Sequence, residues 1–88
     1  MEIIFTPAAL DDLKKIKKSG NNATKKRLER ILLSICETPF EGFASPEQLK
    51  NNLARKWSRE LSKKDRVVYE VQNNTVSIYS LLGHYNDK

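Results

Sequence analysis

Residue types that commonly carry out chemistry are scarce in this chain of 88 residues. The one histidine, His84, follows a β-prone run, TVSIYSLL, and directly precedes Tyr85. The one cysteine, Cys36, falls in an apolar helical stripe, where we expect a buried and inert thiol. These two residues give no zinc-ligand spacing, and the sequence has neither a nucleophile turn for serine–histidine hydrolysis nor a glycine-rich phosphate loop. Acid–base chemistry without a metal or cofactor remains open.

The basic residues fall into two clusters. Residues 10–30 carry eight bases against three acids, and residues 50–66 carry seven against two, so each cluster has the same +5 charge as the whole chain. Two basic surfaces on a small body favour a polyanionic partner such as nucleic acid. A solvated lysine-rich face is the alternative for the first cluster. The second cluster also contains Trp57, a residue type that more often lies in a core than under a stacked base.

The remaining composition predicts a single domain, residues 1–88, in the reducing cytoplasm. One cysteine excludes a disulfide within the chain. No apolar run approaches the roughly 18 residues of a membrane span, so we expect no membrane partner. The N-terminal run MEIIFTPAALDD carries acids where a secretory signal needs bases.

The elements that must position any site begin with a short strand, EIIF, and a helix. Thr6 is expected to cap this helix, and Pro7 fits its first position because the N–H that proline lacks has no helical partner there. Asp11 and Asp12 are expected in the first turns, favourably placed for the helix dipole.

A second helix is predicted directly after the link SGNN. Gly20 suits the left-handed end of the first helix, Asn22 suits the N-cap of the second, and Pro39 marks its end. In between, Leu28, Ile31, Leu32 and Ile35 repeat at helical spacing. The short link predicts an antiparallel helical hairpin with lysines on its outer face.

The last half of the chain predicts a long loop and three strands. Residues 38–52 contain two prolines and a glycine and are expected to form a loop. ARKWSREL, RVVYEV and TVSIYSLL then predict an antiparallel meander. In the middle strand Val67, Tyr69 and Val71 share one face, and Arg66, Val68 and Glu70 share the other. The predicted fold class is α+β in the order β-α-α-β-β-β, with the hairpin on one face of a mainly antiparallel sheet and the other face open.

Several short motifs then carry a resemblance. TPFEG, PEQLK, NL, WSR, DRVVYEV and the late HY, in this order and spacing, resemble the YoeB (Txe) toxins of bacterial toxin–antitoxin systems, within the RelE/ParE superfamily. The similarity runs from TPFEG to Tyr85, over half of the chain. It implies the fold of that superfamily and a ribosome-dependent endoribonuclease (an mRNA interferase) that cuts the messenger in the ribosomal A site.

The resemblance also implies a role for each site residue. Glu47, from the PE pair, would act as general base on a ribose 2′-hydroxyl that attacks the adjacent phosphate. Arg66 would stabilise the pentavalent phosphate, and His84 would protonate the leaving 5′-oxygen, which leaves a 2′,3′-cyclic phosphate. Tyr85 would help to orient the site.

Elementary chemistry agrees with these roles but leaves non-catalytic alternatives open for each residue. An imidazole of ordinary pKa near 6.5 exchanges protons at cellular pH, and a guanidinium matches phosphate oxygens and stays charged. Taken alone, however, Glu47 reads as a loop acid, Arg66 as a partner of Glu60 or Glu70, and His84 as a solvated terminal side chain.

Two further basic residues and two partners complete the expectation. Lys50 and Arg59 are expected to contact RNA phosphates. The resemblance implies a YefM-like antitoxin, whose acidic segment would cover the basic face, and a homodimer. A non-catalytic RNA- or ribosome-binding domain and a ParE-like gyrase inhibitor are the rival functions. The sequence departs from the family pattern at GFAS, at Glu60 and at the three residues after Tyr85, which bears on substrate preference and leaves the catalytic set intact.

Overall fold

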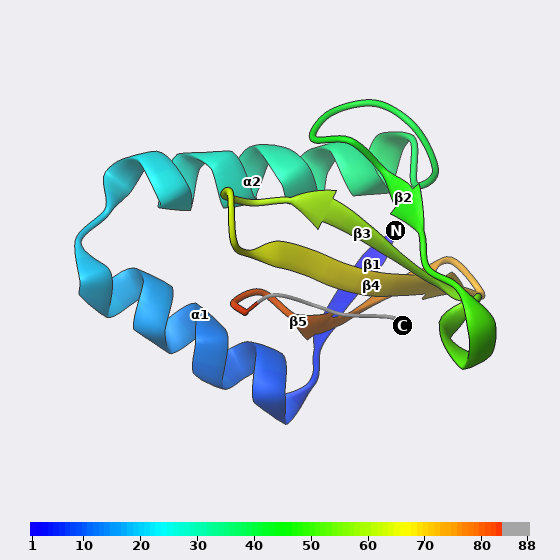
Figure 1. Cartoon of the computed structure of the whole chain (residues 1–88), viewed down its shortest axis with the longest axis horizontal. Coiled ribbons are helices and arrows are strands. Elements are labelled where there is room, and N and C mark those ends of the chain that lie inside the picture. Colours follow the sequence, from blue (N-terminus) through cyan, green and yellow to red (C-terminus); the bar gives the residue numbers. More distant parts are fainter. Residues whose placement is uncertain (84–88) are drawn as a thin grey trace.

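The predicted first strand, two helices and three later strands occur in that order in the computed structural model, which describes residues 1–83 (Figure 1). In chain order the described elements are β1 (Glu2–Phe5), α1 (Pro7–Ser19), α2 (Asn22–Glu37), β2 (Glu47–Gln48), the 3₁₀ helix η1 (Asn51–Leu53), β3 (Lys56–Glu60), β4 (Arg66–Gln72) and β5 (Thr75–Ser80). The order confirms the α+β prediction and adds two elements, β2 and η1, inside the expected loop.

Helix α1 begins and ends where its sequence predicts. The Thr6 hydroxyl accepts the N–H of Ala9 at 3.2 Å, and Pro7 occupies the first turn. Gly20 closes the helix with φ of 75°, the left-handed conformation that glycine adopts without steric cost.

Helix α2 differs from the prediction at its first residue. Asn21, one position before the expected Asn22, is the N-cap, and its side chain accepts the N–H of Thr24 at 3.1 Å. Cys36, near the end of the helix, is half-buried rather than buried. The two helices run in opposite directions from their shared turn, and Figure 1 shows that they diverge towards their far ends.

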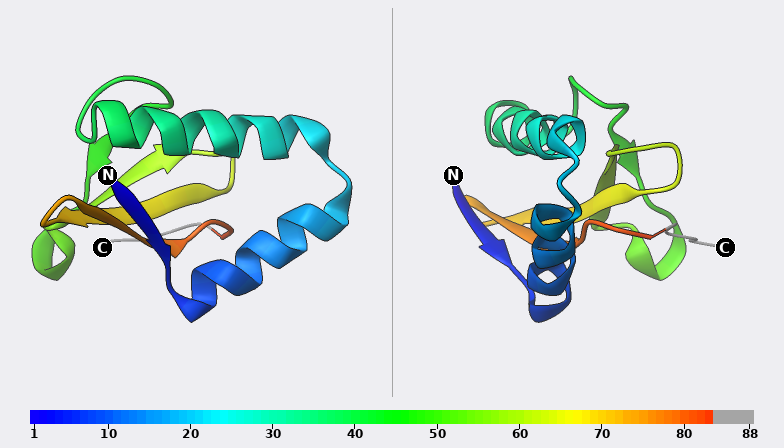
Figure 2. Two further views of the ribbon diagram at one scale, coloured as in Figure 1. Left: turned by 180° about the vertical axis from the view of Figure 1, so that it is seen from behind. Right: turned by 90° about the vertical axis from the view of Figure 1, so that its left-hand side faces the viewer.

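The sheet has five strands among the described residues, in the order β1-β5-β4-β3-β2. β1 pairs with β5 in parallel, and the other neighbours are antiparallel. The sequence concealed β2 because its pairing is not local: Glu47 lies opposite Ser58 and Gln48 opposite Trp57. Figure 2 shows that η1 lies at the end of the molecule farthest from the α1–α2 turn.

The core lies between the helices and one face of the sheet. Its buried residues come from α1, α2, β4, β5 and the segments that follow β3 and β5: Ala9, Ile16, Leu28, Ile31, Ile35, Leu61, Val67, Tyr69, Val76, Ile78 and Leu81. Val67 and Tyr69 face this core as predicted. Val68 belongs to the opposite face, yet it too is fully buried, so the prediction that this outer face is open is wrong at its centre.

A β-bulge ends the pairing of β5. Tyr69 lies opposite Ile78 and Val68 opposite Ser80, which leaves Tyr79 as an extra residue. The chain then leaves the sheet towards α1, where Asp12 accepts the N–H groups that follow the strand. Asp12 therefore lies beyond the first turn of α1 and binds the chain after β5, which corrects its expected role at the helix dipole.

No helix within residues 1–83 has the length and apolar character needed to cross a membrane.

Candidate functional site

Arg66, at the start of β4, projects from the outer face of the sheet and is held by two neighbours. Its Nε donates to the Ser58 hydroxyl at 2.9 Å, and its Nη2 donates to the Ser45 carbonyl at 3.3 Å. Ser58 is fully buried in the adjacent strand β3, so the hydroxyl that holds Arg66 is itself fixed in place. Within the described residues Nη1 makes no hydrogen bond or ion pair. The guanidinium thus has a fixed orientation, and the N–H groups of Nη1 can donate to a ligand.

Strand β2 brings Glu47 beside this guanidinium. Glu47 lies opposite Ser58 in the sheet, and its Oε1 is 3.6 Å from Nη2 of Arg66. The Glu47 side chain is 63% exposed, against 24% for Arg66. The carboxylate can therefore meet a substrate, while the guanidinium stays largely within the surface.

The other acids considered as partners of Arg66 are engaged elsewhere. Glu60 lies opposite Arg66 in the sheet, but its carboxylate approaches Arg27 at 3.9 Å. Glu70 accepts the hydroxyl of Tyr79 at 3.2 Å. The ion pair of Arg66 in this structure is therefore with Glu47.

This pair can perform acid–base chemistry beside a phosphate. A carboxylate can take a proton from a hydroxyl, and a fixed guanidinium can accept the charge that develops on phosphate oxygens. Within residues 1–83, no group of three or more His, Cys, Asp or Glu side chains could hold a metal ion.

His84 and Tyr85 lie outside the described residues. The described chain ends at Gly83, whose N–H donates to Oδ1 of Asp65 at 2.6 Å. Asp65 immediately precedes Arg66 in the sequence. The segment before His84 is thus bound to the same turn that leads into the candidate site.

The structure corrects the expectation that Arg59 contacts RNA. Arg59 is fully buried on the helix-facing side of β3. Its five N–H groups donate at 2.7–3.1 Å to two hydroxyls and three backbone carbonyls, those of Tyr69, Ser34, Phe43, Thr38 and Glu41. With every donor engaged and no exposed surface, Arg59 fastens the loop after α2 to the sheet.

Lys50 and Trp57, the remaining candidates, differ in exposure. Lys50 is exposed, in the N-cap position of η1. Trp57 is half-buried, packs against the core, and contacts the Phe40 ring with centroids 4.9 Å apart. Lys50 remains a candidate for contact with RNA, and Trp57 is at least partly a packing residue.

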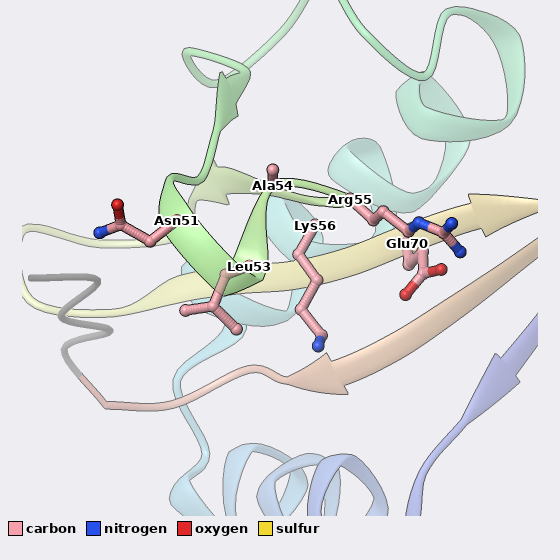
Figure 3. Close-up of a pocket in the computed structure, with 6 residues that line it drawn as sticks. All are labelled: Asn51, Leu53, Ala54, Arg55, Lys56 and Glu70. Atoms are coloured by element: carbon pink, nitrogen blue, oxygen red, sulfur yellow. The ribbon is translucent and has the colours of Figure 1, made fainter.

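A cavity of about 300 Å³ adjoins the outer face (Figure 3). It is lined by η1, the link from η1 to β3, the first residue of β3 and one residue of β4: Asn51, Leu53, Ala54, Arg55, Lys56 and Glu70. Lys56 also lies over the Tyr79 ring, with Nζ 4.6 Å from the centroid. Partial burial, then the hydrogen bond and charge of Glu70, raise the pKa of Tyr79. Tyr79 and Lys56 therefore lie on the same side of the sheet, next to a cavity that Arg55 also lines.

Known proteins resemble this chain in sequence and in fold. Residues 5–85 match the family described as YoeB-like toxin of bacterial type II toxin–antitoxin systems. Toxin YoeB of Escherichia coli strain CFT073 is 33% identical over 97% of this chain and 100% of its own. The YoeB dimer of Staphylococcus aureus superposes with a TM-score of 0.88 at 34% identity, and YoeB in the S. aureus YoeB–YefM complex with 0.86 at 35%; each match covers 97% of this chain and 98% of the other.

The chain belongs to the YoeB-like toxins. It is therefore a toxin of a toxin–antitoxin system, as the motifs implied, and its α+β fold is that of its structural neighbours.

Sequence reasoning missed the residues that support the candidate site. Ser58 and Ser45 hold Arg66, and Asp12 and Asp65 bind the chain before His84. Only Ser58 carried a usable signal, because it lies in WSR within a predicted strand. The others depend on contacts between segments far apart in the sequence.

Proposed function

We propose that this toxin is a ribosome-dependent endoribonuclease that cleaves messenger RNA in the ribosomal A site and so inhibits translation. The ion pair between Glu47 and Arg66 is the observation that carries the proposal, since it joins a solvent-accessible base to an anchored phosphate ligand. Family membership supports it independently.

In the proposed reaction, Glu47 takes the proton of a ribose 2′-hydroxyl. The 2′-oxygen attacks the adjacent phosphorus, and the bond from phosphorus to the 5′-oxygen breaks. Arg66 binds the non-bridging oxygens as their charge grows, and His84 donates a proton to the departing 5′-oxygen. Tyr85 orients the site. The products are a 2′,3′-cyclic phosphate and a free 5′-hydroxyl.

Approximate energies explain why the ribosome would be needed. A general acid or base contributes about 10²–10⁴ in rate, or about 3–5.5 kcal/mol, and stabilisation of the developing charge contributes about 3–4 kcal/mol. Alignment of the attacking hydroxyl with the phosphate is worth about 7–11 kcal/mol more. The Glu47 carboxylate is exposed and can offer little to align a flexible RNA, whereas a messenger fixed in the A site arrives already held.

The partners follow from the relatives. YoeB of S. aureus forms a complex with YefM and also occurs as a dimer. We propose that this chain likewise binds a YefM-like antitoxin and forms a homodimer, in the cytoplasm where translated messengers lie. An acidic antitoxin segment would be complementary to the basic residues around β3 and β4.

Primer extension on a translated messenger, after brief induction of the toxin, tests the proposal. We expect cuts that form about 10²–10⁴-fold more slowly with His84→Gln and that are absent or far slower on naked RNA. Equal rates on naked and ribosome-bound RNA would overturn the ribosome dependence. Translation arrest that survives His84→Gln without cuts would instead indicate a non-catalytic binder. DNA damage with intact messengers would indicate a ParE-like gyrase inhibitor.

A further inference from the structure

Two aspartates bind three successive backbone N–H groups just before His84. Oδ2 of Asp12 accepts from Leu81 at 3.0 Å and from Leu82 at 3.1 Å. Oδ1 of Asp65 accepts from Gly83 at 2.6 Å. Hydrogen bonds of N–H groups to a carboxylate are stronger than those to a neutral acceptor.

Both aspartates are themselves fixed. Asp12 is half-buried on α1, beside the core residue Leu81, which is fully buried. Asp65 closes the turn between β3 and β4: its Oδ2 accepts from the Ser62 hydroxyl at 3.2 Å, and its N–H donates to the same hydroxyl at 3.1 Å. The segment 81–83 is therefore bound between a helix and a turn that belong to the packed fold.

The backbone of Gly83 shows that this segment has a specific conformation. Its φ is 99°, a region that residues with a side chain rarely adopt. A Cβ at this position would meet no atom within 4 Å, so the glycine is required by the backbone angle and not by lack of space.

We infer that Asp12 and Asp65 are positioning residues for His84 and Tyr85, because they hold the segment 81–83 and so fix the point at which the chain continues into these two residues. Asp65 has a special place in this arrangement because it binds Gly83 through its side chain and joins Arg66 through its peptide bond. One residue thereby links the group proposed to protonate the leaving oxygen with the group proposed to bind the phosphate. The inference rests on the proposed function, since it assigns these aspartates to the same reaction.

The matched pair of variants is Asp12→Ala and Asp11→Ala. Asp11 is the exposed neighbour on the same helix, and its carboxylate makes no hydrogen bond or ion pair within the described residues. We expect Asp12→Ala to lower the maximum single-turnover rate of messenger cleavage on ribosomes by about 10²-fold, the effect of misplacing a reacting group. The toxin concentration at half-maximal rate should stay unchanged. Asp11→Ala should change neither quantity.

Two further variants separate positioning from general stability. Asp12→Asn retains an oxygen that can accept from both N–H groups, so it should recover most of the rate lost in Asp12→Ala. In a His84→Gln background, Asp12→Ala should cause no additional loss, because the residue through which it acts is already gone. Gly83→Ala should lower the maximum rate in the same way while removing no hydrogen-bonding group.

Amide hydrogen exchange in the full chain reports the contacts directly. Protection of Leu81, Leu82 and Gly83 should fall in Asp12→Ala and persist in Asp11→Ala. A folded Asp12→Ala protein with an unchanged maximum rate, or with an equal loss in the His84→Gln background, would overturn the inference. If Asp12→Ala does not fold, Gly83→Ala decides the matter, and an unchanged maximum rate there overturns it.

Failure of the proposed function would look different. The wild-type chain would then cut no messenger on ribosomes, and the positioning role in cleavage would fall with the proposed function. Exchange would still decide whether the carboxylates hold the segment: unchanged protection of residues 81–83 in Asp12→Ala would show that they do not.

Discussion

The guanidinium of Arg59 and the phenol of Tyr69 form a hydrogen bond inside the core, with 3.1 Å between Nε and the hydroxyl oxygen. The Tyr69 hydroxyl in turn donates to the Pro39 carbonyl at 2.5 Å. These contacts tie the loop after α2 to the centre of the sheet. The same loop carries the Ser45 carbonyl that accepts from Arg66. A buried residue pair therefore supports one wall of the candidate site.

Tyr69→Phe should lower the free energy of unfolding by about 1–3 kcal/mol, because the Nε donor of Arg59 and the Pro39 carbonyl would lose their buried partner. Urea denaturation followed by circular dichroism measures the change. Tyr79→Phe is the matched control, since its hydroxyl binds Glu70 on the outer, half-buried side of the sheet. Equal losses in the two variants would contradict the role given to the buried hydroxyl.

Arg59→Lys should destabilise the protein by about 3 kcal/mol or more. An ammonium has three donors and lacks the planar fork, so at least two of the five acceptors around Arg59 would lose a partner, each at about 1–3 kcal/mol. The same denaturation experiment measures this loss. A contact with RNA phosphate predicts the opposite pattern, in which lysine preserves stability and only weakens RNA binding.

Stability at alkaline pH should depend on Tyr69. Burial is the main cause that raises the pKa of Tyr69, and the hydrogen bond and charge of Arg59 oppose it. Above about pH 10, the unfolded chain loses this proton while the folded chain retains it, so the folded state loses stability as the pH rises towards its own, higher pKa. The difference in unfolding free energy between wild type and Tyr69→Phe should therefore shrink between pH 9 and about pH 11. A constant difference would show that Tyr69 titrates alike in both states.

Local signals in the sequence predicted the elements best. The cap at Thr6 and Pro7 and the left-handed Gly20 depend only on neighbouring residues, and the structure confirms them. The cap of α2 was placed one residue late because Asn21 and Asn22 are chemically identical. Strand β2 was missed because the surrounding prolines and glycine indicate a loop, and only its pairing with β3 makes it a strand.

Part of the site could be predicted from sequence motifs and from the alternation of side chains along a strand. Glu47 and Arg66 were named from motifs, and the structure brings them together, although no local pattern indicates that distance. The burial of Arg59 could have been foreseen: Trp57 and Arg59 are two apart in a strand, so they share a face. Because Arg59 belongs to a basic cluster of the sequence, it was predicted to lie at the surface instead. The contacts of Asp12 with the chain after β5 span 69 and 70 residues, beyond any local rule.

Lys50→Ala should weaken binding of a short single-stranded RNA and reduce its salt dependence. The slope of log affinity against log salt should fall by about 0.7 for one lost phosphate contact. Fluorescence anisotropy at several salt concentrations measures it. Lys14→Ala is the matched control, because Lys14 is an exposed lysine on α1, away from the outer face of the sheet. An unchanged slope in Lys50→Ala would remove Lys50 from the RNA-binding surface.

Glu47→Gln should lower the maximum single-turnover rate of messenger cleavage on ribosomes by about 10²–10⁴-fold, because an amide keeps the shape of the side chain but cannot take the proton of the 2′-hydroxyl. Glu41→Gln is the matched control, since Glu41 is an exposed acid of the preceding loop whose carboxylate makes no hydrogen bond or ion pair within the described residues. Quenched-flow kinetics over a range of toxin concentrations separates rate from binding. If Glu47→Gln raised only the concentration needed for half-maximal rate, the carboxylate would serve to hold Arg66 or the messenger, and another group would have to act as the base.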